Sequence, residues 1–507
     1  MIRFLSYLMI LSTLAVMSCD KFLEVEVPDN LVQQEYWQNR EQVLASRNGM
    51  YTALHNSLNL FHVWGDIRSS FYAPGPGDSF SGDYRQFMSQ DIYPTNGLVQ
   101  WNSVYTSITW INSFIKNAPS ALQNDPTFKQ SELDVFMGEA YALRALHYFY
   151  LVRAYKEVPI IEDPYESDVQ KFNTEAKSEQ EVLDFIESDL DKALGTVSED
   201  FQDVNDRYGR ITKNAVRALW ADVKLWRNEY QAALELCGQL GAYRSSLVLP
   251  QDWFSIFNPG NSSESIFEYQ YVQTGLSSPM YGWFAHVQGL TDGAKYLANP
   301  VNIELNGIEI YPAQEPINWS ADTIRLKTYG AFNQNPIPYA GGNGYEVYKM
   351  LGQTPYVVSY RPAGGRNVNY IFYRYREVLF MEAEALAMLG RYPEAEERIN
   401  LIRQHCDIPL LEPGAMAAGV DFMRFLLMER EFELGFEGKE WFAAVRIGRR
   451  QGYESVLLEK SAENNPLGLQ YQVVRARMLN PESWFLPYHE TELENNKSLL
   501  QKEYYKN

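Results

Sequence analysis

Apolar residues recur at spacings of three and four along much of the first half of the chain, which predicts amphipathic helices. One such helix starts after Ser178, where Ser178 and Glu181 form a capping box that would satisfy free backbone N–H groups. Its apolar face consists of residues at helical spacing: Val182, Phe185, Ile186, Leu190 and Ala193. Thr212 stands in a similar position before another apolar face and predicts a helix to about Trp226.

Two segments combine the end of one helix, a tight turn and the start of a second helix. In the first, Asn228 lies in the turn and Tyr230 follows; in the second, Gly390 and Tyr392 take the same places. Asn and Gly tolerate the left-handed backbone conformation that ends many helices. The pattern resembles a tetratricopeptide unit, and simple helical hairpins would also produce it.

Residues 136–155 are apolar almost all round, as a membrane-spanning helix would be. They nevertheless include Glu139, Arg144, His147 and Arg153, whose side chains are costly to place in hydrocarbon. We therefore expect this helix to lie in the core of a large folded unit.

The stretch from Gly241 to Asn369 has a different character. It contains three clusters of residues typical of turns: 258–261, 341–344 and 363–366. Only short strand-like pieces such as 265–272 lie between them, and irregular segments of this length are usually functional. We expect a loop-rich subdomain laid over a helical scaffold, with helices resuming at Tyr370.

Composition narrows the class of protein. The chain has 507 residues with 44 Lys and Arg against 64 Asp and Glu, a net charge of −20, which argues against a nucleic-acid partner. With 46% hydrophobic residues it can bury a large core, which excludes intrinsic disorder. The aromatic fraction of 14% is high for a core alone, and three cysteines exclude a disulfide framework.

Residues 1–18 have the form of a bacterial signal peptide. Arg3 supplies a positive charge, residues 4–16 are mostly apolar, and a small residue precedes Cys19. The segment is too short to span a bilayer, which takes about 20 residues. A cysteine at this point resembles a lipoprotein processing site, where acylation of Cys19 would anchor the chain. An ordinary secretory peptide with a chance cysteine is the alternative.

No sequence motif predicts an enzyme, a cofactor or a metal site. The chain lacks HExxH, GxSxG, a P-loop, paired CxxC motifs and a convincing dinucleotide fingerprint, and no two of its six histidines lie four residues apart. A glycoside hydrolase remains an alternative, because its two carboxylates need no fixed sequence spacing.

Aromatic residues in loops, next to amides and charged side chains, are the candidate chemistry. The apolar faces of sugar rings stack on Trp and Tyr, and sugar hydroxyls need hydrogen-bonding partners. The candidate glycan-binding residues are Tyr72, Asp78, Tyr84, Arg85, Trp101, Asn102, Tyr281, Trp283 and Trp319. The alternative is that each aromatic packs in the core. Trp101 fits this alternative best, because Tyr105 and Ile108 follow it at helical spacing.

Several blocks in order resemble the SusD/RagB family of outer-membrane nutrient-uptake lipoproteins. They are residues 19–25, 138–145 with Val158-Pro159, 375–379 with 383–385, 429–446, and the tail from Trp484 to Gln501. Within them, Glu139, Arg144, Glu377, Glu429 and Arg430 are interpreted as partly buried pairs that lock helices together. Lys439 stands where the family usually has Arg, and Ala443 where it often has Asp, which predicts one missing ion pair between helices.

The resemblance implies a mainly all-α fold of tetratricopeptide-like helix pairs with a loop-rich face. We expect a signal peptide (1–18) and one SusD-like domain (19–507), with an N-terminal helical part (19–240), a loop-rich ligand side (241–369) and a C-terminal helical part (370–507). The resemblance also implies a non-enzymatic protein on the outer membrane, facing outside. It would deliver oligosaccharide to a SusC-like TonB-dependent transporter. Peptide cargo is the main alternative.

Overall fold

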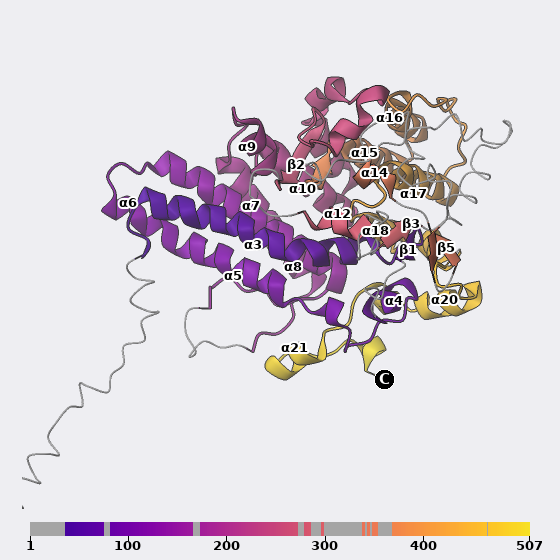
Figure 1. Ribbon diagram of the computed structural model, residues 1–507, viewed down its shortest axis with the longest axis horizontal. Helices are drawn as coiled ribbons and strands as arrows, with labels where there is room; N and C mark the ends of the chain where they lie inside the picture. Colours follow the sequence, from indigo (N-terminus) through magenta and orange to yellow (C-terminus); the bar gives the residue numbers. More distant parts are fainter. Residues whose placement is uncertain are drawn as a thin grey trace, which may run out of the picture.

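The computed structural model describes residues 36–75, 82–165, 173–271, 278–284, 296–298, 337–339, 342–344, 347–352, 368–463 and 465–506. Helices dominate, and the long ones of the N-terminal half lie side by side in Figure 1. These are α3 (Arg40–Asp66), α5 (Asn102–Asn117), α7 (Gln130–Tyr155) and α8 (Glu179–Thr196), with the shorter α4 (Gly82–Met88), α6 (Ala121–Asn124) and α9 (Val204–Gly209). The mainly helical fold predicted from the sequence is confirmed.

The second half of the chain continues with shorter helices. They are α10 (Lys213–Trp226), α11 (Tyr230–Gly238), α12 (Pro279–Phe284), α14 (Tyr348–Leu351), α15 (Tyr375–Met388), α16 (Tyr392–Gln404), α17 (Val420–Leu434), α18 (Glu440–Gly448), α19 (Glu454–Ala462), α20 (Tyr471–Met478) and α21 (Glu490–Asn495). Short 3-10 turns connect several of them: Gly97–Val99, Ala118–Ser120, Gly241–Ser246, Pro250–Ile256, Pro481–Trp484 and Glu503–Tyr505.

Helix α7 is the centre of the N-terminal half, packed against α3, α5 and α8. Its charged residues are buried and paired, as the sequence predicted. The Arg144 guanidinium donates to both carboxylate oxygens of Asp189 at 2.7 and 2.9 Å, and Glu139 accepts from Tyr51 at 2.6 Å. These pairs join α7 to α8 and to α3, so the helix is held in the core by partnered charges.

The predicted helix starts and helical hairpins are confirmed. Ser178 and Glu181 form the capping box of α8, and Thr212 caps α10. Helices α10 and α11 pack as one hairpin and α15 and α16 as another, and α11 contacts α15. The two turns contain Asn228 and Gly390 with φ of 62° and 77°, the left-handed conformation expected there.

The segment after Tyr370 begins as a strand, which corrects the prediction that helix resumes there. Strand β6 (Tyr370–Arg374) pairs antiparallel with β2 (Ser265–Tyr269), and both are fully buried. Aromatic and β-branched side chains in residues 370–373 favour the extended conformation, and helix α15 follows directly. Two further strand pairs are β1 (Tyr72–Pro74) with β3 (Tyr296–Ala298), and β4 (Ile337–Tyr339) with β5 (Gly342–Gly344).

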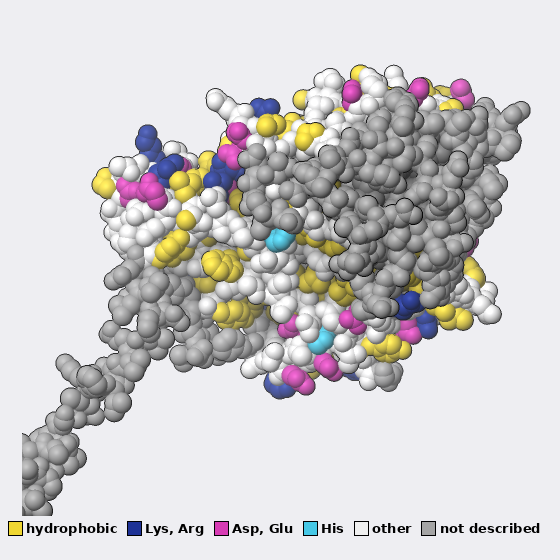
Figure 2. All heavy atoms as spheres, in the orientation of Figure 1, with side chains coloured by type: hydrophobic (Ala, Val, Ile, Leu, Met, Phe, Trp, Pro, Cys, Tyr) yellow, Lys and Arg dark blue, Asp and Glu magenta, His cyan; other side chains and the backbone are white. Residues whose placement is uncertain are grey.

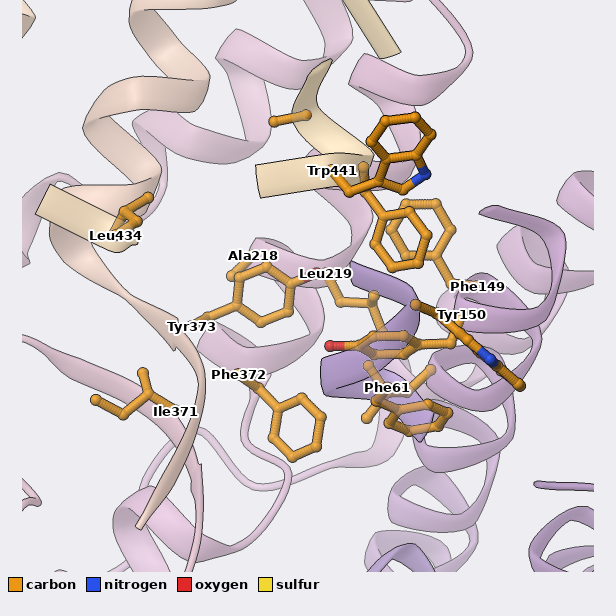
Figure 3. Close-up of a cluster of buried hydrophobic side chains, with 14 of the residues drawn as sticks. Phe61, Phe149, Tyr150, Ala218, Leu219, Ile371, Phe372, Tyr373, Leu434 and Trp441 are labelled. Atoms are coloured by element: carbon orange, nitrogen blue, oxygen red, sulfur yellow. The ribbon is translucent and has the colours of Figure 1, made fainter. Parts of the chain in front are cut away.

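A continuous aromatic core joins the N-terminal and C-terminal helices. Phe61 of α3 stacks on Tyr150 of α7 with ring centroids 3.8 Å apart, and Tyr150 meets Phe372 of β6 edge to face. Figure 3 shows these rings together with Trp441 of α18. Much of the high aromatic content therefore serves the core.

A network of buried charges lies beside this core. Arg374 and Arg376 at the β6–α15 junction contact Glu264 before β2 and Glu433 of α17, and all four side chains are fully buried. Lys439 pairs with Glu377 of α15 at 2.5 Å, so its ammonium has a partner, while Ala443 supplies no carboxylate for a further pair. The remaining predicted pairs are also present, between Arg403 and Glu429 and between Arg430 and Glu440.

Candidate functional site

Strand pairing brings together two groups of candidate residues that are far apart in the sequence. Strand β1 pairs antiparallel with β3, with Tyr72 opposite Ala298 and Pro74 opposite Tyr296. Helix α12 lies against α3, where the Trp283 and His62 rings are 4.7 Å apart. The candidates around Tyr72 and around Trp283 therefore share one region of the fold.

Within this region the described aromatic candidates are buried. Tyr72 has no exposed surface and donates its hydroxyl to Asp66 at 2.7 Å, while Tyr84 and Trp283 are 5% and 6% exposed. The expectation that these three rings are exposed is wrong: Tyr72 packs against Phe436, Trp283 packs against His62, and Tyr84 of α4 is buried as well. Arg85 is half-buried on α4. Asp78, Trp319 and the side chain of Tyr281 lie outside the described residues, as does Cys19.

Trp101 and Asn102 lie at the start of α5, next to the C-terminal tail. Trp101 is 4% exposed and packs against Tyr155 and Tyr488, with ring centroids 4.8 and 5.3 Å away. Its indole is therefore mostly covered by the protein, and its role in glycan binding stays a prediction. Asn102, in contrast, is exposed.

An open pocket of about 190 Å³ adjoins these two residues. It is lined by side chains from α5, from the segment after α7 and from the tail: Trp101, Asn102, Tyr105, Pro159, Ile161, Tyr165, Thr174, Glu492, Asn495, Asn496 and Leu499. The tail is fixed in place by backbone and side-chain bonds, since Leu486 N–H donates to Ala154 O at 2.8 Å and Tyr488 donates to Glu157 O at 2.8 Å. The pocket thus depends on the docked C-terminus.

Some polar groups of the pocket are committed to the protein and others are available. Tyr105 donates to Pro159 O at 2.7 Å, and the Asn496 amide donates to Thr174 O at 2.7 Å. Among the described residues, the side-chain N–H groups of Asn102 and the side-chain amide of Asn495 have no hydrogen-bond partner. With Tyr165 38% exposed, the pocket combines an accessible ring with free amides.

The pocket contains one carboxylate among its described lining residues, Glu492. Burial raises the pKa of Glu492, and hydrogen bonds from the Trp101 indole and backbone oppose the shift. Glycosidases need two carboxylates on either side of the scissile bond, and this lining supplies a single one. The arrangement is suited to holding a neutral, hydroxyl-rich ligand.

Sequence reasoning identified Trp101 and Asn102 but missed Tyr165, Asn495 and Glu492. These residues have no local pattern that distinguishes them, because the segment after α7 brings Tyr165 to α5 and the docked tail brings Glu492 and Asn495 there. Within the described part of the chain, no cluster of three or more potential metal-ligating side chains occurs. In the same part of the chain, none of the helices has the length and apolarity needed to cross a bilayer.

Comparison with known proteins shows two family models that match complementary parts of the chain. Residues 327–505 match the model described as the SusD family. Residues 21–225 match one described as starch-binding and associating with the outer membrane. A SusD-like protein of Formosa agariphila is 26% identical over 487 residues, covering 88% of this chain and 91% of its own length.

Solved structures share the fold at low sequence identity. A SusD-like protein from Bacteroides fragilis superposes with a TM-score of 0.71 at 20% identity, covering 94% of this chain and 99% of its own. A laminarin-binding SusD-like protein superposes with a TM-score of 0.68 at 19% identity, covering 92% and 99%.

Proposed function

The chain belongs to the SusD family, and on that premise we propose that it is a non-enzymatic lipoprotein that binds oligosaccharide at the outer membrane and delivers it to a SusC-like TonB-dependent transporter. The description of the family model that matches residues 21–225 supports both a glycan ligand and a location at the outer membrane. A structural relative that binds laminarin supports a glycan as the cargo.

The observation that carries the glycan proposal is the lining of the pocket beside α5. Tyr165 offers an accessible ring for the apolar face of a sugar, and the amides of Asn102 and Asn495 offer donors and acceptors for its hydroxyls. The single carboxylate in the described lining agrees with capture rather than cleavage.

Replacing Tyr165 with Ala is expected to weaken glycan binding by about 2- to 12-fold, the value of one ring contact. Asn495→Ala should weaken binding as well, by removing a free amide, and neither change should lower the melting temperature because both side chains are exposed. Affinities would be measured by isothermal titration of the mature chain with neutral oligosaccharides.

The control for this experiment is Tyr93→Ala, which removes an exposed ring outside the pocket lining. Equal affinities for all variants would contradict the pocket assignment. If the wild-type protein binds peptides and no glycan, the proposed cargo would be a peptide. Release of reducing ends from polysaccharide by the purified chain would contradict the non-enzymatic assignment.

Cys19→Ser is expected to move the protein from the outer-membrane fraction to the soluble fraction, because the acylated thiol is the proposed anchor and several acyl chains bind a bilayer durably. Fractionation of cells labelled with a fatty-acid analogue would measure this. Cys237→Ala is the matched control, since it removes a buried thiol and leaves the acylation site. Wild-type protein that carries no label would indicate an ordinary secretory peptide.

A further inference from the structure

Helices α3 and α5 lie antiparallel and in contact. Ser57 and Ser107 hydroxyls are 3.2 Å apart at the seam, and Ser107 donates to Ala53 O at 2.8 Å. Their buried residues face α7 and each other, which leaves an outer face of each helix on the same side of the molecule. Figure 1 shows the two helices side by side on the left of the molecule.

The shared outer face, called here the α3–α5 face, carries two rows of exposed side chains at a spacing of four. They are Asn48, Thr52 and Asn56 on α3, and Asn102, Thr106 and Trp110 on α5. A spacing of four places side chains one above the other along a helix. Each row is therefore a line of uncharged residues parallel to the other.

Trp110 is the unusual member of this face. It is 56% exposed, and it is the only tryptophan among the described residues that is exposed. Every other tryptophan in the described part of the chain is buried or half-buried. Nothing in the packing of α5 requires an indole at this position, because Val104, Ile108 and Ile111 fill the buried side.

In a strongly acidic protein, the α3–α5 face carries no charged side chain between its ends, beyond which Glu41 of α3 and Lys116 of α5 are exposed. None of its six side chains is charged, although the chain carries a net charge of −20. Arg47 of α3 points away from it, toward the Phe136 ring of α7 at 5.3 Å. In Figure 2 the described surface over α3 and α5 is white and yellow, while blue and magenta side chains gather at its left end and below it.

We propose that the α3–α5 face is a track that binds a neutral polysaccharide chain extending from the pocket beside α5. A lipid surface or a nucleic acid would need basic side chains, and the face has none. A stable protein interface would need an apolar or ion-paired centre, and the face has one ring in a field of amides and hydroxyls. Those groups suit sugar hydroxyls, and the indole suits a pyranose ring.

The track is continuous with the pocket and extends it along α5. Asn102 belongs to both, since it lines the pocket and starts the α5 row. The α5 row from Asn102 to Trp110 spans eight helical steps, which is about 12 Å at the helical rise. Side-chain amides of Asn48 and Asn56 have no hydrogen-bond partner among the described residues, so they are available to the ligand. The inference rests on the proposed glycan function and adds a preference for long, uncharged chains.

The first test is affinity electrophoresis in gels that contain a neutral polysaccharide (laminarin, amylopectin or xylan) or the anionic alginate. The second is titration of the protein with a trisaccharide of the polymer that retains it. Trp110→Ala is expected to weaken polymer binding about 2- to 12-fold and to leave trisaccharide binding in the pocket unchanged. Thr106→Glu should have a similar effect by placing a charge in the track, without loss of folding, since Glu favours helix more than Thr. The control is Leu410→Ala, which removes an exposed apolar side chain elsewhere.

The outcomes separate the two proposals. If the wild-type protein and Trp110→Ala are retained equally on a neutral gel, the track proposal is overturned and the pocket proposal stands. Stronger retention on alginate than on every neutral gel would also overturn the track, because its chemistry is uncharged. No retention or titration by any glycan would overturn the proposed function together with the track. We expect Tyr165→Ala to weaken binding of both the polymer and the trisaccharide. Trp110→Ala is expected to weaken binding of the polymer alone.

Discussion

Replacing Arg374 with Met is expected to lower the free energy of unfolding by about 3–5 kcal/mol, because the change leaves buried carboxylates without their partner. The Arg374 guanidinium contacts Glu264, Glu433 and Glu437 at 3.3, 2.9 and 2.8 Å, and all four side chains are buried. It also donates to the backbone oxygen of Glu433 at 2.7 Å. Methionine fills much of the volume but returns none of these hydrogen bonds.

The pKa of Glu437 shows what the network does to ionisation. Burial alone would raise this pKa, but Arg374 and Lys349 outweigh it and hold the pKa at about 2. A folded-state pKa below the ordinary value of 4.5 means that the carboxylate stabilises the fold above pH 4.5, and that this contribution is lost as the pH falls toward 2. The deficit of Arg374→Met should therefore be largest near neutral pH and shrink in acid.

Urea unfolding of the purified mature chain at several pH values would measure this effect. Arg391→Met is the matched control, since Arg391 pairs with Glu394 on the surface with both side chains more than 40% exposed. Such exposed pairs contribute about 0.2–1 kcal/mol. A loss for Arg374→Met no larger than that of the control would show that the buried network does not stabilise the fold.

Trp101→Ala is expected to lower the free energy of unfolding by about 3–5 kcal/mol, the usual cost of removing a buried large aromatic. Its indole is covered by Tyr105, Tyr155 and Tyr488. These rings connect the start of α5 to the end of α7 and to the tail, so the cavity would loosen the wall of the pocket. Glycan affinity should fall with stability, as a consequence of the damaged pocket.

Denaturant unfolding and glycan titration of the same variants distinguish affinity lost through lower stability from affinity lost because Trp101 contacts the ligand directly. Trp101→Phe keeps a ring in the cluster and should recover most of the stability, whereas Trp110→Ala, which removes an exposed indole, should change stability by less than about 0.5 kcal/mol. Full stability of Trp101→Ala with weakened binding would instead support the sequence prediction that Trp101 stacks on the ligand.

Local patterns in the sequence correctly predicted the helix caps and turns. The capping box at Ser178, the cap at Thr212 and the turns at Asn228 and Gly390 all occur as predicted, since each depends on residues a few positions apart. The pairing of buried charges was also predicted correctly for Arg144, because a charge in an apolar helix requires a partner. The division of residues 19–507 into three parts stays a prediction.

The partners themselves could not be read from the chain. Arg144 pairs with Asp189 on another helix, and β6 pairs with β2 about a hundred residues earlier, as the register Tyr269 opposite Tyr370 shows. Strand pairing of this kind overrode the expectation of helix after Tyr370. Such contacts depend on where distant elements meet, which no local pattern specifies.

For the site, the sequence by itself indicated which residue types a glycan would need and placed Trp101 and Asn102 among the candidates. Only the tertiary structure decided which aromatic rings are accessible. Tyr72, Trp101 and Trp283 are covered by Phe436, the tail and α3, while Trp110 is left in solvent. The physical reason is that exposure belongs to a side chain together with everything packed around it, and those neighbours come from parts of the chain hundreds of residues apart.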